Sequence, residues 1–442
     1  MLNRQSAPAR GSSATSGGKE TLIAFATQVW VLLASLGTQS VLAWMLAPAG
    51  RGAYAVCMLF AGILGGIFSL GIDRAAQYFV MSNTQSISQG GSVAIITALV
   101  GGGVAILLGA FLIYSPISFF QKADSTAFWI SLSLIPLTVA IAVLQLQLAG
   151  QRRFARLGLI IIVHTSSNLV FILLLVRFLD LGVHGALIAQ IASSVLVISL
   201  LFLDLRVACG FRLMLPNWSH FQQVFSYGFR YYLASIGNMI DLGLGTFIIA
   251  MFGSREDIGL FTAASALVLK VLVFPDSIEA VLLPRITADP VGSIDLVGQC
   301  IRLSTLFTGF AIASIVAVSV PLVNILLSPR FLPSVPLIWI LAPGVFIYGG
   351  SQILMGYFRG INRPGVCSLA IWVGFIANAL ALVVLYPLLG LPAAAWAMTI
   401  GFASRSLVLF GAYRRISGRH ALETMRFQRG DFAIIKRMLR RA

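Results

Sequence analysis

The sequence RGAYAV, which begins at Arg51, has a counterpart, IGLFTA, which begins 207 residues later at Ile258. Gly52 and Gly259 occupy the same place in the two stretches, and an aromatic residue follows each glycine two positions later. A single match of this length is expected by chance. It gains meaning only if other landmarks recur at nearly the same distance.

Two further landmarks do recur. LAGQRRF and FRGINRP place Gly150 and Gly360 210 residues apart, and LDLGVHGALIAQ and LLGLPAAAWAM place Gly182 and Gly390 208 residues apart. Three matches at one offset predict two homologous halves. If each half has six membrane crossings, the even number keeps both halves in the same orientation. The pseudo-twofold axis then lies along the membrane normal.

The composition is that of an integral membrane protein. The chain has 442 residues, of which 58% are hydrophobic and 10% charged, whereas a soluble domain has roughly 25% charged residues. Apolar runs of about 20 residues, long enough to cross the hydrocarbon core, recur along the chain. We therefore predict an all-α fold with twelve transmembrane helices at 22–46, 53–72, 92–114, 126–148, 157–179, 184–206, 229–253, 257–284, 303–327, 335–358, 366–387 and 391–413.

These spans divide the chain into two six-helix halves, an N-terminal half at 22–206 and a C-terminal half at 224–413. A basic, polar segment at 207–223 is predicted to be a cytoplasmic linker. Residues 1–21, rich in Ser, Gly and Ala, are predicted to be a disordered cytoplasmic tail, because the apolar run that follows is too long for a signal peptide. Residues 414–442 form a basic cytoplasmic tail.

Positive charges predict the orientation, because cytoplasmic loops are enriched in Lys and Arg. Of the 30 Lys and Arg residues, 22 lie in the two tails and the even-numbered loops. The odd-numbered loops hold five, namely Arg51, Lys122, Arg177, Arg255 and Arg330. Both termini are therefore predicted to be cytoplasmic. The net charge of +16 is then mainly a consequence of topology, and no nucleic-acid partner is expected.

The basic tail interleaves arginines with apolar residues such as Phe427, Phe432 and Leu439. This pattern fits an interfacial helix on anionic lipid, and it fits equally a solvated tail that fixes the topology. The four cysteines show neither a disulfide framework nor metal-ligand spacing. No cofactor and no metal site is predicted.

The loop with Arg-Gly-x-aromatic, the Gly-Gln-Arg-Arg turn at 150–153, the Gly-x-x-Gly-Ala entry at 182–186 and their second copies resemble the Wzx-type polysaccharide-transport flippases. That family belongs to the multidrug, oligosaccharidyl-lipid and polysaccharide exporter superfamily. The resemblance implies a V-shaped transporter in the bacterial inner membrane. It implies alternating-access transfer of an undecaprenyl-diphosphate-linked oligosaccharide to the outer leaflet, for lipopolysaccharide or exopolysaccharide synthesis. It also leaves room for contacts with a polysaccharide polymerase and other assembly proteins.

Charged residues at membrane depth are candidates for function, because burying them in lipid costs at least about 2.5 kcal/mol each. The spans 229–253 and 257–284 share the short loop GSRED, from which depth can be counted. Asp241 lies 13 residues before Ser254, and Lys270 lies 14 residues after Glu256. By the same count Arg230 and Glu279 lie at matched depth. We therefore predict two ion pairs across this hairpin, Asp241 with Lys270 and Arg230 with Glu279, either as cavity lining or as structural pairs.

Cationic groups suit a diphosphate, whose oxygens accept hydrogen bonds from guanidinium and ammonium groups. Pro275, inside the span 257–284, breaks its helix and is a further pointer to a binding site. The candidate substrate-binding residues are Lys270, Arg230, Arg405, Arg74, Arg359 and Asn238. Because the span 22–46 has no carboxylate, the candidates for cation coupling are Asp241, Glu279 and Asp73.

Other functions are weighed against this one. A cation-coupled multidrug exporter of the same superfamily is the alternative, but that branch resembles proteins with an acidic residue deep in the first helix. An enzyme acting on lipid-linked sugars needs carboxylates or an arginine-rich segment outside the membrane, beside the acceptor. Here the outer loops are all short, and the cytoplasmic loops lack paired carboxylates and Gly-rich phosphate loops. The chain is therefore predicted not to be an enzyme. A scramblase has no need of charges at membrane depth on both helices of one hairpin.

Overall fold

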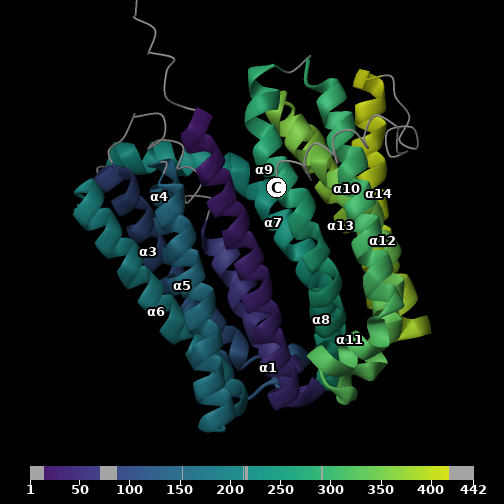
Figure 1. The fold of residues 1–442 in the computed structure, drawn as a ribbon. Coiled ribbons are helices and arrows are strands. Elements are labelled where there is room, and N and C mark those ends of the chain that lie inside the picture. Colours follow the sequence, from purple (N-terminus) through teal and green to yellow (C-terminus); the bar gives the residue numbers. More distant parts are fainter. Residues whose placement is uncertain are drawn as a thin grey trace, which may run out of the picture.

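The computed structural model, shown in Figure 1, describes residues 14–69, 87–151, 153–212, 214, 218–289 and 292–417, and this part of the chain is helical without any strand. The α-helices are α1 (Ala14–Ser69), α3 (Ile87–Ile113), α4 (Ser125–Gly150), α5 (Phe154–Ile172), α6 (Gly182–Cys209), α7 (Trp218–Phe252), α8 (Arg255–Leu269), α9 (Val273–Ala288), α10 (Ile294–Ala317), α11 (Ser319–Leu326), α12 (Val335–Gly360), α13 (Pro364–Leu389) and α14 (Leu391–Ser417). Short 3₁₀ turns are η1 (Ser118–Lys122), η3 (Lys270–Leu272) and η4 (Pro329–Ser334), and η2 (Leu173–Phe178) is a π-helical turn.

Ten helices among the described residues are long and apolar enough to cross a membrane. One of them, the 43-residue stretch Ala26–Phe68 of α1, bends back on itself and crosses twice. Helix α7, whose apolar part is Met239–Phe252, adds another crossing. The described residues therefore supply twelve crossings, six in each half, which confirms the predicted all-α membrane fold.

Helix α1 reverses at Ala47, whose backbone has φ 53° and ψ 177°. The next residue is Pro48, which disfavours helical backbone in the residue before it. The two arms on either side of this turn contact different helices. A Cβ on Gly37 would lie 3.5 Å from Leu169 of α5, whereas a Cβ on Gly65 would lie 3.7 Å from Ile135 of α4.

The repeated glycines have physical reasons to be glycine. Gly182 and Gly390, at the entries to α6 and α14, have φ of +54° and +62°, a left-handed conformation that costs little only without a Cβ. Gly150 and Gly360 are the last residues of α4 and α12. The repeats predicted from the sequence thus recur at equivalent places in the structure.

The first repeated pair, Gly52 and Gly259, lies where the halves meet. A Cβ on Gly52 would be 1.8 Å from the carbonyl oxygen of Arg255, and a Cβ on Gly259 would be 1.9 Å from that of Pro48. Pro48 and Arg255 are themselves 207 residues apart. The contact is therefore reciprocal, as expected at a pseudo-twofold axis, and small residues allow such close approach of helices in membranes.

Figure 1 shows that the two halves meet at one end and diverge toward the other. The meeting end, formed by residues 47–52, 114–124, 253–255 and 327–334, is called the loop end. The opposite end, where α1 begins and α14 ends, is called the terminal end. One buried apolar cluster contains residues of both halves, while smaller clusters lie within the C-terminal half and the N-terminal half.

Polar contacts across the loop end join the halves further. Ser118 Oγ donates to the carbonyl of Met251 at 2.7 Å, and Lys122 Nζ donates to that of Gly253 at 2.6 Å. The guanidinium carbon of Arg51 lies 5.6 Å from the ring centroid of Phe331. Nearer the terminal end, Tyr232 Oη of α7 donates to the carbonyl of Ile67 at 2.8 Å.

Some boundaries differ from the predicted spans. The predicted helix 303–327 is α10 followed by a separate helix, α11, with a bend at Val318. The predicted helix 257–284 is divided into α8 and α9 by η3, whose residue Val271 is four positions before Pro275. A proline has no N–H to donate to the residue four positions earlier, and its ring crowds that carbonyl. Most of the basic tail lies beyond Ser417, outside the described residues.

Candidate substrate and coupling site

The C-terminal half holds a buried ion pair between Asp241 of α7 and Arg405 of α14. Only 4% of Asp241 and 1% of Arg405 is exposed. Asn378 of α13 donates from Nδ2 to Asp241 Oδ1 at 2.8 Å, and Arg405 Nη1 donates to Tyr348 Oη of α12 at 3.2 Å. Four helices therefore contribute to one network, in which the carboxylate is neutralised and hydrogen-bonded.

Small and aromatic residues make room for the Arg405 side chain. A Cβ on Gly374 would lie 3.0 Å from Arg405 Cβ, and a Cβ on Gly401 would lie 2.8 Å from the Cβ of Asn378. The Tyr348 ring lies 5.3 Å from the guanidinium carbon. It stacks on Phe402 with ring centroids 4.6 Å apart. This packing fixes the orientation of the guanidinium.

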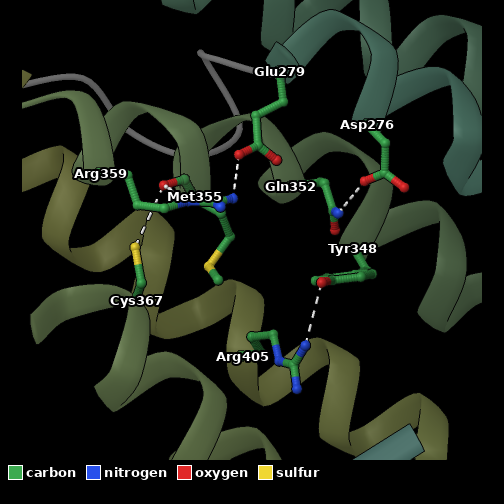
Figure 2. A network of polar contacts seen from close by, with 8 residues as sticks. All are labelled: Asp276, Glu279, Tyr348, Gln352, Met355, Arg359, Cys367 and Arg405. Carbon is green, nitrogen blue, oxygen red and sulfur yellow. Dashed lines mark hydrogen bonds and ion pairs between the residues drawn. The ribbon is translucent and has the colours of Figure 1, made fainter. Parts of the chain in front are cut away.

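A second cluster lies closer to the terminal end, between α9 and α12 (Figure 2). Glu279 forms an ion pair with Arg359, and Asp276 accepts a hydrogen bond from the Gln352 amide. The Glu279 side chain is 11% exposed, whereas that of Arg359 is 50% exposed. A Cβ on Gly356 would lie 2.4 Å from Glu279 Cγ, so this glycine admits the glutamate between the helices.

The predicted ion pair between Asp241 and Lys270 is wrong. Helix α7 packs against α13 and α14 as well as against α8. The carboxylate of Asp241 points toward α13 and α14, and it therefore meets Arg405. Equal depth on one hairpin does not determine which way each side chain rotates about its helix. The described partner of Glu279 is Arg359, and the predicted pair with Arg230 stays a prediction, because the Arg230 side chain lies outside the described set.

Lys270 begins the 3₁₀ turn η3, where α8 is interrupted. Its side chain is partly buried, and no described carboxylate lies within ion-pair distance of it. It lies 15 residues from Arg255 at the start of α8, which is about 22 Å of helix. A cation therefore stands at membrane depth without an anionic side chain beside it in the described part of the chain.

Four predicted site residues fall outside what is described. Asp73 and Arg74 lie in the undescribed segment 70–86. Arg230 and Asn238 belong to α7, but their side chains are outside the described set. Their proposed roles remain predictions.

Sequence reasoning missed Tyr348, Asp276 and Gln352 as members of the two clusters. The spacing of Asp276 and Glu279, three positions apart on one helix face, was a usable signal for the second cluster. Arg405 lies 15 residues after Gly390 and Asp241 lies 13 before Ser254, so matched depth across different hairpins was a signal for the first.

The described residues contain no group of three or more His, Cys, Asp or Glu side chains that would hold a metal ion. Asp241 and Glu279 each have an arginine partner. Asp276 is different, because its described partner is a neutral amide. The arrangement provides cations for an anionic ligand, Lys270 and Arg359, and one carboxylate at membrane depth without a cation at ion-pair distance in the described set.

A family model described as polysaccharide biosynthesis protein matches residues 41–336. No curated protein matches the chain. The lipid II flippase MurJ, solved in an inward closed conformation, is similar with a TM-score of 0.75 and 14% identity, over 92% of this chain and 88% of that chain.

Multidrug transporters are similar as well. An inward-facing MATE family transporter of the MOP superfamily matches with a TM-score of 0.66 and 17% identity, over 90% of this chain and 95% of that one. The MATE multidrug transporter DinF-BH matches with a TM-score of 0.65 and 13% identity, over 96% of this chain and 100% of that one. At these identities the similarity shows the shared fold of a membrane transporter.

Proposed function

Because the chain belongs to the polysaccharide biosynthesis protein family, we propose that it is a flippase for a lipid-linked oligosaccharide. The substrate is carried on undecaprenyl diphosphate and moves from the inner to the outer leaflet of the bacterial inner membrane. Transfer occurs by alternating access between the two halves, with the diphosphate held by cations of the protein.

The observation that carries this proposal is the position of Lys270 at membrane depth without a described carboxylate beside it. A charged group at membrane depth needs a partner, a water-filled cavity or an oppositely charged ligand, and Lys270 has no described carboxylate at ion-pair distance. It lies at a helix break, which is typical of transporter binding sites. A diphosphate is an anion of suitable chemistry.

Arg359 is the second proposed ligand, because half of its side chain is exposed although it bonds Glu279. Arg405 has a different role in this proposal, since it is buried against Asp241. It holds α7 and α14 together and does not touch the substrate in this conformation. Arg74, Arg230 and Asn238 remain proposed contacts for the same ligand.

The proposal includes an orientation with the terminal end in the cytoplasm, based on the distribution of Lys and Arg. Reporter fusions after Gly253 and after Gly418 test it. The first is expected to report an external position and the second a cytoplasmic one. The opposite pair of signals contradicts this orientation.

The alternative, a cation-coupled drug exporter, is supported by the fold it shares with MATE transporters. Such coupling needs a carboxylate that is free to bind and release the cation and is not held by an arginine of the protein. Asp276 is the candidate that the contacts favour, since Asp241 and Glu279 are neutralised by arginines. If Asp276→Asn abolishes export of a cationic dye while the purified protein binds no lipid diphosphate, the drug exporter replaces the flippase.

Variants of Lys270 test the flippase proposal. Lys270→Gln is expected to weaken binding of undecaprenyl diphosphate and to abolish glycan export, whereas Lys270→Arg keeps both in part. Because Asp241 is held by Arg405, neither variant strands a carboxylate, so the protein still reaches the membrane. Arg330→Gln, at the loop end, is the matched charge control. Normal binding and export by Lys270→Gln refute the role of Lys270.

A further inference from the structure

A groove of about 430 Å³ lies at the terminal end of the C-terminal half, between the end of α12, the start of α13 and the end of α14. It is separate from the clusters around Asp241 and Glu279. Its walls include Val366, Leu369, Leu407 and Val408, and its rim includes Arg363 and Arg415. An apolar groove with a cationic rim is therefore open at this surface.

The cationic rim has no anionic partner in the described part of the chain. Arg363 and Arg415 are both exposed, and no described carboxylate lies within ion-pair distance of either. Arg363 is the residue before the first turn of α13, and no side chain caps that turn. Pro364 has no N–H, and the Val366 N–H is donated to the Arg363 carbonyl, so it is the positive end of the α13 dipole that favours an anion there and adds to the two guanidinium charges.

The apolar part of the groove extends from this rim toward the middle of the bilayer. Leu407 is eight residues before Arg415 on α14, which is about 12 Å along the helix. Leu407 is 73% exposed and Leu369 is 57% exposed. Between Leu407 and Arg415, Gly411 leaves open space, since a Cβ there would meet nothing within 4 Å.

We propose that this groove binds an anionic phospholipid of the surrounding leaflet. The lipid phosphate lies between Arg363 and Arg415 at the start of α13, and one acyl chain lies along Leu369 and Leu407. Charge complementarity favours this occupant over the protein's own tail, because residues 418–442 carry seven Lys and Arg but only Glu423 and Asp431 as acids. A zwitterionic lipid gains less from two arginines, since its phosphate is already neutralised.

Native mass spectrometry of the full chain, with phosphatidylglycerol added to the detergent, tests the proposal. The expected result is one tightly retained phosphatidylglycerol per chain and no retained phosphatidylcholine. Removing both arginines, with Arg363→Gln and Arg415→Gln, is expected to weaken retention roughly thirtyfold, since each basic residue near anionic lipid contributes a factor of about five.

Two further variants separate the groove from general surface charge. Gly411→Leu fills the groove from a position with open space, so it should abolish retention without unfolding the protein. Arg414→Gln removes the same charge one position away and outside the groove lining, and should leave retention unchanged. Equal retention by all variants, or equal retention of phosphatidylcholine, overturns the proposal.

The same measurement distinguishes a lipid of the bilayer from the transported substrate. Undecaprenyl diphosphate is added in place of phosphatidylglycerol. If it alone is retained, and its retention is lost on Gly411→Leu, the groove is a substrate site and the phospholipid assignment is wrong. If Lys270→Gln fails to export glycan but still retains phosphatidylglycerol, the groove acts independently of the transport path.

Discussion

The two halves of the molecule place an asparagine at equivalent positions but surround it with different chemistry. Asn168 and Asn378 each lie 18 residues after the repeated glycines Gly150 and Gly360. In the C-terminal half, Asn378 donates to a buried carboxylate that is also held by Arg405.

In the N-terminal half the same position makes only neutral contacts. Asn168 Nδ2 donates to Gln190 Oε1 at 2.7 Å and to Ser193 Oγ at 3.1 Å, both on α6. Among the described residues, the same backbone position therefore contacts an ion pair in one half and neutral side chains in the other. A buried pair adds little net stability over an apolar replacement, whereas losing one partner is costly, so the two positions should respond differently to substitution.

The largest expected difference between the halves comes from breaking the buried ion pair. Arg405→Leu leaves the carboxylate of Asp241 buried with a hydrogen bond from Asn378, and should lower the free energy of unfolding by about 3–5 kcal/mol. Adding Asp241→Leu should restore most of that loss. Denaturant unfolding in detergent measures both.

Arg414→Gln, on the exposed end of the same helix, is the control and should change stability by less than about 0.5 kcal/mol. If the single and double variants lose equal stability, the two side chains are not energetically coupled. The comparison between the charged contacts of Asn378 and the neutral contacts of Asn168 then fails.

The reciprocal glycine contact should respond alike in both halves. Gly52→Ala and Gly259→Ala each place a methyl group against a backbone carbonyl that no rotamer change can move, so each should destabilise closure at the loop end by about 3 kcal/mol. Spin labels at Gln121 and Glu256, one in each half, should report a longer distance in both variants.

Gly62→Ala is the matched control, because a Cβ there meets nothing within 4 Å. A response from only one of the two glycines contradicts the pseudo-twofold contact. An unchanged label distance in both variants means that the contact does not hold the loop end closed.

The smallest expected difference comes from the equivalent asparagines themselves. Asn378→Leu removes a hydrogen bond to a charged group and should cost about 2 kcal/mol, whereas Asn168→Leu removes neutral ones and should cost about 1 kcal/mol. Thermal unfolding of the two variants side by side measures the ratio. Equal losses mean that the charge on Asp241 adds nothing at this position.

The helices and the duplication were predictable from sequence, because apolar runs and glycines with special conformations are local features. Gly182 and Gly390 need a left-handed backbone, and Gly52 and Gly259 need close approach, so both copies of the repeat contain these glycines. Partner choice is not local. Asp241 faces Arg405 because of the rotation of α7 and its packing against α13 and α14. Counting residues from one loop gives the depth of a side chain, but it determines neither the rotation nor the packing of the helix.

Transport itself is tested most directly with purified protein in proteoliposomes that hold an undecaprenyl-diphosphate oligosaccharide. The measurement is the fraction of oligosaccharide that becomes accessible to an external glycosidase. We expect translocation by the unaltered chain, loss of translocation in Lys270→Gln, and retention of it in Arg330→Gln. Accessibility that equals that of protein-free liposomes, or that is unchanged in Lys270→Gln, contradicts a flippase that holds the diphosphate at Lys270.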